Sequence, residues 1–483
     1  MSETECYGAQ CDRNETKGRA RRIGRRVFYA TVATLMSVLV AHAQEAKPKF
    51  SILSTVHISS DAPATRHVET WLAVNPRNPQ NRIVASMTLA PRGGLVVYAS
   101  TDGGKSWRRA KHGERDALTI EGGDPVIAFD SAGTAYFGYL AHGFKISRST
   151  DGGLTWSSPS TVPGRGYDRP WLGVDQNNGQ IYAAGKLPIQ ILEGVGEREV
   201  IGFSSSQDGG RTFGFPSLRL PGAPQEKALH AVTDMAVLPD GKLVLVYLTY
   251  DLPPLLPGDL GRGRFWCLIS ADGGRTFAGP YLAAEHRSYG HAREWQSLKG
   301  LGGGHLAVDT SNSSHKGWLY LAFLDVAEER FQVVVATSLD GGKTWSKPLR
   351  VNDNKTASNQ SNVGVRVNAQ GVVGIVWNDR RDDPSDNCFR PYFTASLDGG
   401  QNFLANQKVS DAAGCTLTPD GKPAPERFPN GGDTFGMAAL PDGTFQIAWI
   451  NGKSGVWQLY SSVIRVESLP GSTKATFQKG IDR

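Results

Sequence analysis

Carboxylate, guanidinium and phenol side chains follow or precede short apolar runs at several places in the sequence. Carboxylic acids can donate or accept a proton while a bond breaks, and a tyrosine hydroxyl can act as a nucleophile. The candidate catalytic residues are therefore Asp124, Asp168, Tyr250 and Asp251.

Arginines next to acidic residues form a second group of candidates. They occur in Asp168-Arg169 and in Asp379-Arg380-Arg381. The planar guanidinium can bind a carboxylate through two parallel hydrogen bonds, which favours an anionic ligand. The candidate substrate-binding residues are Glu69, Arg169, His305, Asp379, Arg380 and Arg381. The alternative is that any one of these side chains is merely solvated or links neighbouring strands.

These side chains are positioned by a unit that the chain repeats. Each unit contains an apolar β-hairpin, and the first six hairpins are followed by a third strand, a turn and a fourth strand. The seven hairpins lie at residues 71–86, 125–139, 171–184, 235–247, 306–323, 363–377 and 436–449. The pattern predicts an all-β chain with seven four-stranded units.

The turn between the third and fourth strands has a fixed sequence, Ser-x-Asp-Gly-Gly-x-(Thr/Ser/Asn)-(Trp/Phe). The carboxylate can accept backbone N–H groups, the glycines tolerate positive φ, and the aromatic ring can anchor the turn by burial. Six copies are present, at residues 100–107, 149–156, 206–213, 270–277, 338–345 and 396–403.

This turn is the Asp-box signature, and the chain resembles the sialidase-type (BNR-repeat) β-propellers over nearly everything after residue 48. The resemblance implies a β-propeller with the boxes on the face away from the active site. Seven repeats predict seven blades, and a six-bladed ring with an appended sheet is the alternative. Residues 44–466 are expected to form this propeller, with residues 467–483 as a polar tail.

The N-terminal segment at residues 54–61 resembles the fourth strands at 349–353 and 407–411, but no box precedes it. We expect it to complete the seventh blade by pairing with residues 456–466, which would close the ring and remove an exposed edge.

The strand order assigns the candidate residues to one face. If the boxes connect third and fourth strands on one side, then the inner strands begin and the second strands end on the other side. All of the candidates, together with Asp234, fall at such positions. A funnel lined by carboxylates and arginines suits a polar, anionic ligand.

The sialidase resemblance also implies chemistry: three arginines that bind the sugar carboxylate, a tyrosine nucleophile assisted by a glutamate, and an aspartate acid/base. The family's Arg-Ile-Pro motif is absent, because residues 66–71 read Arg-His-Val-Glu-Thr-Trp. Residues 168–171, Asp-Arg-Pro-Trp, match it in part.

The N-terminus resembles an export signal. Five arginines between residues 19 and 26 precede an apolar run at 27–41, and Ala-His-Ala at 41–43 is a small-residue cleavage pattern. We predict a signal peptide at 1–43, an extracytoplasmic protein and no membrane span in the mature chain; an uncleaved anchor is the alternative.

Charge and cysteine content add further constraints. The formal charge is +6, and residues 1–43 carry seven Lys/Arg and four Asp/Glu, so the remainder carries +3 and gives little support for a nucleic-acid partner. Cys388 and Cys415 fall in loops on one face, which makes a disulfide plausible in an exported protein, and Cys267 lies in an apolar strand as a buried thiol. No cofactor and no closed metal site are expected.

The sequence therefore predicts an exported propeller that handles a carbohydrate. A glycoside hydrolase of sialidase (exo-α-sialidase) type acting on an acidic glycan is the first expectation. A non-catalytic carbohydrate- or protein-binding propeller and a polysaccharide lyase are the alternatives.

Overall fold

The computed structural model describes residues 49–89, 93–112, 120–192, 196–219, 228–250, 260–289, 304–415, 431–432 and 434–467. The predicted signal peptide, residues 468–483 of the predicted tail and the candidate Asp251 lie outside these ranges. The described residues belong to one compact unit, Lys49–Glu467, whose regular elements are all β-strands. No helix in the described part of the chain is long and apolar enough to cross a membrane.

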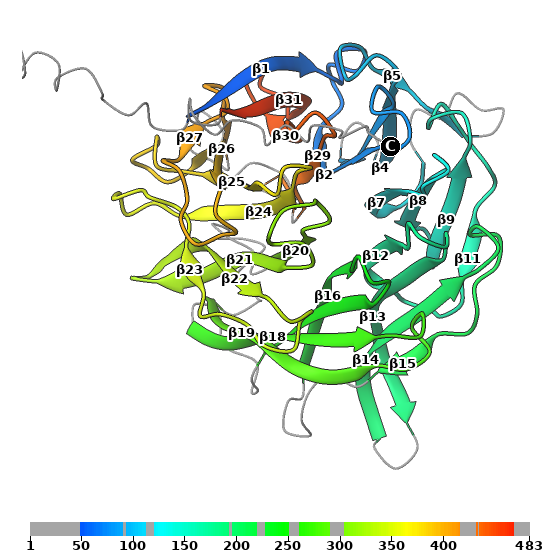
Figure 1. Ribbon diagram of the computed structural model, residues 1–483. Coiled ribbons are helices and arrows are strands. Elements are labelled where there is room, and N and C mark those ends of the chain that lie inside the picture. Colours follow the sequence, from blue (N-terminus) through cyan, green and yellow to red (C-terminus); the bar gives the residue numbers. More distant parts are fainter. Residues whose placement is uncertain are drawn as a thin grey trace, which may run out of the picture. The chain divides into compact units, whose positions relative to one another are not determined.

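The strands form seven blades around a ring, as Figure 1 shows. Blades 1 to 3, each from its inner to its outer strand, are: β2 (His67–Val74), β3 (Arg82–Thr88), β4 (Gly94–Ser100) and β5 (Arg108–Arg109); β7 (Gly123–Phe129), β8 (Ala135–Leu140), β9 (Phe144–Ser149) and β11 (Ser160–Val162); β12 (Asp168–Val174), β13 (Ile181–Leu192), β14 (Gly196–Ser206) and β15 (Ser217–Arg219).

Blades 4 to 7 follow the same order: β16 (Ala228–Val237), β17 (Leu243–Tyr250), β18 (Leu260–Ser270) and β19 (Ala278–Tyr289); β20 (Gly304–Val308), β21 (Leu319–Ala327), β22 (Arg330–Ser338) and β23 (Leu349–Arg350); β24 (Gln360–Val367), β25 (Val373–Asp379), β26 (Cys388–Ser396) and β27 (Gln407–Lys408); β29 (Gly436–Ala439), β30 (Phe445–Asn451), β31 (Gln458–Glu467) and β1 (Lys49–His57). Short strands β6 (Lys111–His112) and β10 (Thr155–Trp156) pair with each other, and β28 (Gly414–Cys415) pairs with β26.

The ring closes through the two chain segments that the sequence predicts, although the N-terminal strand covers Lys49–His57 rather than residues 54–61. The N-terminal strand β1 pairs antiparallel with the C-terminal strand β31, from Lys49 opposite Glu467 to His57 opposite Tyr460. The two strands lie side by side in Figure 1. The seven-bladed prediction is confirmed, and the six-bladed alternative is wrong because the seventh hairpin is completed by β1 rather than appended outside the ring.

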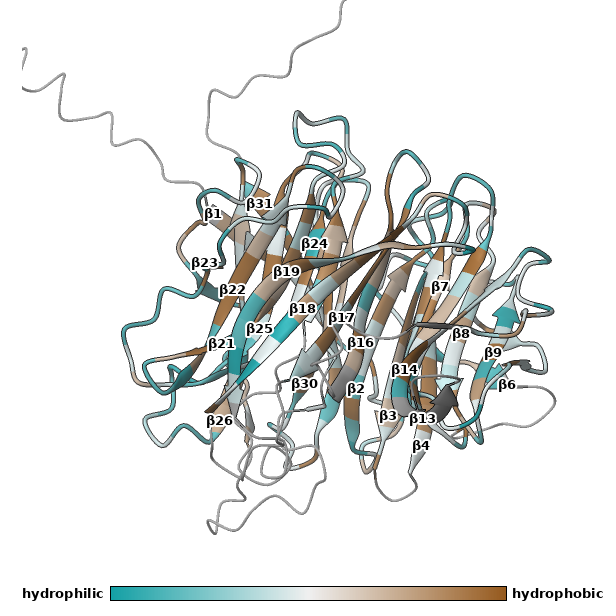
Figure 2. Cartoon of the chain, turned by 90° about the horizontal axis from the view of Figure 1, so that it is seen from below, coloured by the Kyte–Doolittle hydropathy of each residue, from teal (hydrophilic) through white to brown (hydrophobic). Residues whose placement is uncertain are grey.

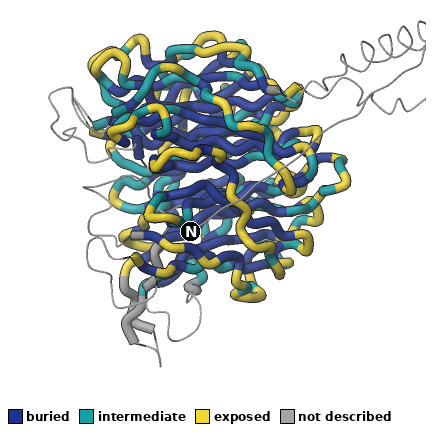
Figure 3. The backbone as a smooth tube through the Cα atoms, turned by 90° about the vertical axis from the view of Figure 1, so that its left-hand side faces the viewer, coloured by how far each residue is buried: buried dark blue, intermediate teal, exposed yellow. Residues whose placement is uncertain are grey.

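Apolar side chains are concentrated in the sheets. Figure 2 shows the strands mainly brown and the connecting loops mainly teal, and Figure 3 shows that exposed segments gather at the connections. Blades are also joined at the centre by indole N–H groups. Trp71 of blade 1 donates to the carbonyl of Ile127 in blade 2 at 2.8 Å, and Trp171 of blade 3 donates to Val232 of blade 4 at 2.8 Å.

The six Asp-Gly-Gly turns share one hydrogen-bond pattern. In the turn after β4, the Ser100 hydroxyl donates to Asp102, and the same carboxylate accepts the backbone N–H groups of Lys105 and Ser106. Slight burial opposes ionisation, but these bonds favour the charged form and lower the pKa of Asp102 to about 2. The second glycine of the turn also packs on the preceding blade: a Cβ at Gly274 would lie 2.2 Å from the ring of Phe203.

Two cysteines are joined in the described structure. Cys388 on β26 and Cys415 on β28 form a disulfide with 3.9 Å between their Cα atoms. Cys267 is a free, fully buried thiol, and burial raises its pKa.

Candidate active site at the mouth of the ring

Three inner strands begin with the same backbone irregularity. Glu69, Asp124 and Arg169 have φ of 51°, 52° and 50°. Each sits where the pairing register shifts at the start of its inner strand, which is a β-bulge. A non-glycine residue in this left-handed region costs roughly 1–2 kcal/mol, and a bulge re-aims the side chain. The three bulges therefore change the direction of three charged side chains, which occupy equivalent positions in three successive blades.

The three residues meet at one cavity on the face where the inner strands begin, which we call the mouth. This mouth cavity is lined by Glu69, Trp71, Asp124, Pro125, Val126, Arg169, Pro170, Trp171, Ala231, Val232, Thr233, Leu248, Gly304, His305 and Thr434. Four of the sequence-predicted residues are thus brought together: Glu69, Asp124, Arg169 and His305. They come from blades 1, 2, 3 and 5.

Aromatic rings pack together below the charged groups. The rings of Trp71 and Trp171 are 5.3 Å apart in an edge-to-face arrangement, and the imidazole of His305 lies 5.5 Å from Trp171 and 6.1 Å from Trp71. Glu69 and His305 are buried, whereas Asp124 and Arg169 are half-buried. The cavity therefore joins an apolar wall to acidic, basic and imidazole groups, which is a common composition for a ligand site.

The volume of the cavity limits what can enter it. It measures about 40 Å³. Since one water needs roughly 10–15 Å³ on this measure, the cavity holds about three waters. Pockets that enclose a whole small ligand are typically about 300–1,000 Å³. Within its described walls, the cavity therefore accepts a substituent such as a carboxylate or a hydroxymethyl group rather than a sugar ring.

The backbone of Glu69 is held by the neighbouring seventh blade. Its amide donates to the carbonyl of Gly431 at 2.8 Å, and a Cβ at Gly432 would lie 2.3 Å from the Glu69 side chain. Blade 6 carries the same irregularity at Asn362, with φ of 49°, but its side-chain amide donates to the carbonyl of Gly432 at 2.7 Å. In blade 6 the left-handed residue therefore ties two blades together.

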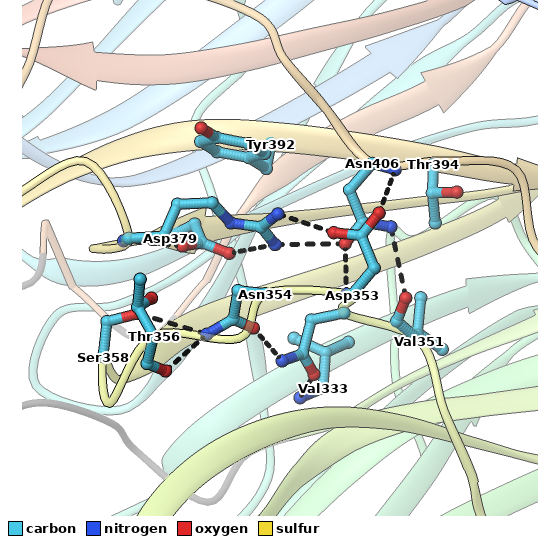
Figure 4. Close-up of polar contacts among 12 residues, drawn as sticks. Val333, Val351, Asp353, Asn354, Thr356, Ser358, Asp379, Tyr392, Thr394 and Asn406 are labelled. Atoms are coloured by element: carbon cyan, nitrogen blue, oxygen red, sulfur yellow. Dashed lines mark hydrogen bonds and ion pairs between the residues drawn. The ribbon is translucent and has the colours of Figure 1, made fainter.

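Arg381 and Asp379 do not line the mouth cavity. The guanidinium of Arg381 donates to Asp353 at 2.6 Å, to Asp379 at 2.9 Å and to Asn406 at 3.1 Å. It also lies 4.4 Å from the ring centroid of Tyr392. Figure 4 shows Asp379, Asp353, Asn406 and Tyr392 in this network. The expectation that Arg169 converges on one cavity with Arg380 or Arg381 is wrong, because neither of these two lines it and the terminal nitrogens of Arg381 bond to blade 6 and its adjoining loops.

Arg380 is likewise a part of blade 6. Its side chain is fully buried, donates to the Ser361 hydroxyl at 3.1 Å and lies 5.5 Å from the ring centroid of Phe389. Burial lowers the pKa of Arg380 to about 10, against the attraction of nearby carboxylates. The acidic run that follows Asp379 thus compensates a buried cation instead of facing a ligand.

Two predicted catalytic residues also lie elsewhere. Asp168 is exposed, pairs with Lys186 at 3.6 Å and is not among the residues that line the cavity. Tyr250 is half-buried at the end of β17, with its ring 5.6 Å from that of His286 and outside the cavity lining. Neither joins Asp124 at the cavity.

Sequence reasoning missed the two tryptophans as cavity residues. Trp71 and Trp171 each stand two positions after a charged residue, Glu69 and Arg169, and that repeated spacing was the available signal. The bulges themselves gave no signal, since Glu and Arg are not residues that favour positive φ. No group of three or more His, Cys, Asp or Glu suited to a metal ion occurs among the described residues.

No family model matches the chain. A xyloglucanase from Paenibacillus sp is 25% identical in an alignment of 370 residues that covers 69% of this chain and 33% of the xyloglucanase. The chain thus spans about a third of the length of that relative.

Solved structures resemble the chain at low identity. An ulvan lyase from a new polysaccharide lyase family has a TM-score of 0.49 and 14% identity, covering 86% of this chain and 98% of its own. The NanB sialidase from Streptococcus pneumoniae has a TM-score of 0.40 and 11% identity, covering 86% of this chain and 70% of its own.

Proposed function

We propose that the protein is a carbohydrate-active enzyme, a glycoside hydrolase that cleaves a carboxylate-bearing glycan at the mouth cavity. The observation that carries this proposal is the left-handed conformation shared by Glu69, Asp124 and Arg169 on one cavity. Backbone strain in non-glycine residues clusters at functional sites, where the surrounding fold maintains it for the sake of a side-chain position.

The side chains have separate roles in this proposal. Arg169 pairs with the carboxylate of the bound sugar. Glu69 and Asp124 are the candidates that give a proton to the oxygen of the departing sugar. Trp71 and Trp171 form an apolar wall of the cavity beside these groups.

The small volume sets how the substrate lies. Only a substituent enters the cavity, so the sugar rings lie across the mouth and the carboxylate points inward. This arrangement suits an extended glycan as well as a terminal sugar. The 25% identity to a xyloglucanase supports a polysaccharide as the substrate class, while the activity of that longer relative remains a hypothesis for this chain.

Sialidase-type chemistry has less support than hydrolysis in general. The resemblance implied three arginines and a tyrosine nucleophile, and the described lining of the cavity contains one arginine, Arg169, and no tyrosine. A sialylated substrate therefore belongs in the test as one of several acidic glycans.

A polysaccharide lyase is the second candidate, because one observation favours it. The imidazole of His305 lies on the same cavity as Arg169, with its Nδ1 atom 3.6 Å from the carboxylate of Asp234. A base beside an arginine could remove a proton next to a carboxylate that the arginine neutralises. The uronate would then undergo elimination rather than hydrolysis.

We also propose that the protein acts outside the cytoplasm. Residues 1–43 have the composition of an export signal, and the Cys388–Cys415 disulfide suits an oxidising compartment.

The experiment is a turnover screen of the purified protein on uronate-containing, sialylated and neutral glycans. Hydrolysis yields new reducing ends without new ultraviolet absorbance, elimination yields the absorbance, and a binding protein yields neither. The proposal predicts reducing ends from an acidic glycan and their loss in Asp124→Asn. New ultraviolet absorbance would show that the protein is a lyase instead of a hydrolase. Binding without turnover would refute the proposal that it is an enzyme.

A further inference from the structure

His305 is held on several sides by residues of other blades. Its imidazole packs against Trp171 of blade 3 and Trp71 of blade 1, and its Nδ1 atom faces Asp234 of blade 4. The side chains of His305 and Asp234 are about 5% and 10% exposed. A histidine with so little freedom is oriented by its surroundings rather than by solvent.

Asp234 is itself fixed by two backbone groups. One carboxylate oxygen accepts the N–H of Met235 at 2.7 Å, and the other accepts the N–H of Leu306 at 3.0 Å. Leu306 is the residue after His305, so the same carboxylate oxygen holds the strand β20 and faces the imidazole. Its distance of 3.6 Å to Nδ1 is slightly longer than a hydrogen bond, as is common before a substrate is bound.

A third charge interacts with Asp234. Burial lowers the pKa of the Arg366 guanidinium on β24, and attraction to Asp234 opposes that shift. The charged groups near the imidazole are thus Asp234 and its neighbour Arg366, with Glu69, Asp124 and Arg169 on the same cavity. The carboxylate oxygen that faces the imidazole can accept a hydrogen bond from Nδ1–H.

We propose that Asp234 is a positioning residue that holds the proton of His305 on Nδ1, so that Nε2 is the proton acceptor of the mouth cavity. This inference rests on the proposed function and deepens it by assigning the acceptor. In hydrolysis, Nε2 takes a proton from water as the water oxygen bonds to the anomeric carbon. The bond from that carbon to the departing oxygen breaks, and the departing oxygen takes the proton of Asp124 or Glu69.

The first test needs no substrate. Nitrogen NMR of the intact protein, with imidazole signals assigned by His305→Gln, reports which ring nitrogen carries the proton. The wild type is expected to show Nδ1–H and a bare Nε2 at neutral pH. In Asp234→Asn the amide can donate to Nδ1, which shifts the proton to Nε2. An Nε2–H tautomer in the wild type would overturn the inference, even if the variant fails to fold.

The second test uses turnover and its pH dependence. Asp234→Asn should lower kcat by roughly 10²-fold or more, because the wrong nitrogen then carries the proton. The pH profile of kcat should change as well, because the charge next to the imidazole is then absent. The matched control is Asp325→Asn, a half-buried carboxylate of blade 5 that accepts the N–H of Arg287 and is not in the cavity lining.

The outcomes separate the inference from the proposed function. The expected tautomers without turnover on any glycan would support the positioning role and refute the enzyme. Turnover with an unchanged pH profile and unchanged tautomer in Asp234→Asn would refute the positioning role and leave the enzyme intact.

Discussion

Glu69 and Arg169 hold a left-handed backbone conformation that their residue types rarely adopt, and Asp124, whose type tolerates it better, holds the same conformation. Asparagine tolerates the left-handed region better than most residues. We therefore expect Asp124→Asn and Arg169→Asn to change the free energy of unfolding by less than about 1 kcal/mol. Loss of the Asp124 proton should lower kcat by about 10²–10⁴-fold. Denaturant unfolding and turnover measure the two effects, and a destabilised but fully active Asp124→Asn would contradict the assignment.

Arg381 provides the opposite case. Removing its guanidinium in Arg381→Ala leaves the fully buried Asp379 without its main cationic partner, which should destabilise the fold by roughly 3–5 kcal/mol. Turnover per folded molecule should stay unchanged. A stable variant that no longer binds glycan would restore Arg381 to the substrate site.

The sequence placed the charged residues correctly by strand position but not by side-chain direction. Glu69, Asp124 and Arg169 reach the cavity because each lies at a β-bulge, and the residue types at these positions do not predict a bulge. Arg380 and Arg381 directly follow the second strand of blade 6, which ends on the same face. Nearby aspartates and aromatic rings contact their guanidinium groups, so these groups do not reach the cavity. Whether an arginine faces a ligand site or pairs with a neighbouring aspartate depends on distances in the folded chain, and the sequence does not give these distances.

At the scale of the elements, the Asp-Gly-Gly turns join neighbouring blades as well as neighbouring strands. Gly274, the second glycine of its turn, and Gly241, in another turn of the same blade, have nearly the same positive φ, 85° and 83°. A Cβ at Gly274 meets Phe203 of blade 3 at 2.2 Å, whereas nothing lies within 4 Å of a Cβ at Gly241. The two glycines therefore separate backbone strain from packing.

We predict that Gly241→Ala costs about 1 kcal/mol of unfolding free energy from strain alone. Gly274→Ala should cost about 2–4 kcal/mol, because overpacking adds to the strain. Equal losses in the two variants, measured by denaturant unfolding, would mean that the turns do not clamp the blades.

The positions of most strands were predictable because apolar hairpins and the Asp-Gly-Gly turns recur in order. The lengths of the outer strands were not predictable. The outer strand β19 runs from Ala278 to Tyr289, although outer strands elsewhere, such as β5 and β23, have two residues. The far part of β19 is bonded to the next blade, because Asp325 of blade 5 accepts the N–H of Arg287, and a contact between blades is not visible in the sequence of one strand.

At the scale of the whole molecule, two buried histidines link stability to pH. Burial, assisted by Arg109 and His57, lowers the pKa of His67 to about 3, and burial lowers that of His286 to about 4. Both are neutral in the fold and protonate in the unfolded chain near pH 6.5. Stability is therefore present above pH 6.5 and is lost as pH falls toward 4.

The expected slope is about 1.4 kcal/mol per pH unit for each histidine within that window. His286→Leu has a similar volume and cannot titrate, so it should reduce the combined slope by about half. Unfolding measured between pH 7 and 4.5 checks this, and an unchanged slope would show that His286 is not buried as a neutral group.

The central claim is that the mouth cavity binds a glycan carboxylate through Arg169. Its most direct test compares kcat/KM for two oligosaccharides that differ only in a carboxylate, in the wild type and in Arg169→Asn. A charge-assisted hydrogen bond contributes about 1.5–3 kcal/mol, so the wild type should prefer the acidic oligosaccharide by about 10- to 100-fold, and Arg169→Asn should abolish that preference. Equal turnover of both oligosaccharides by the wild type, or an intact preference in the variant, would contradict the claim.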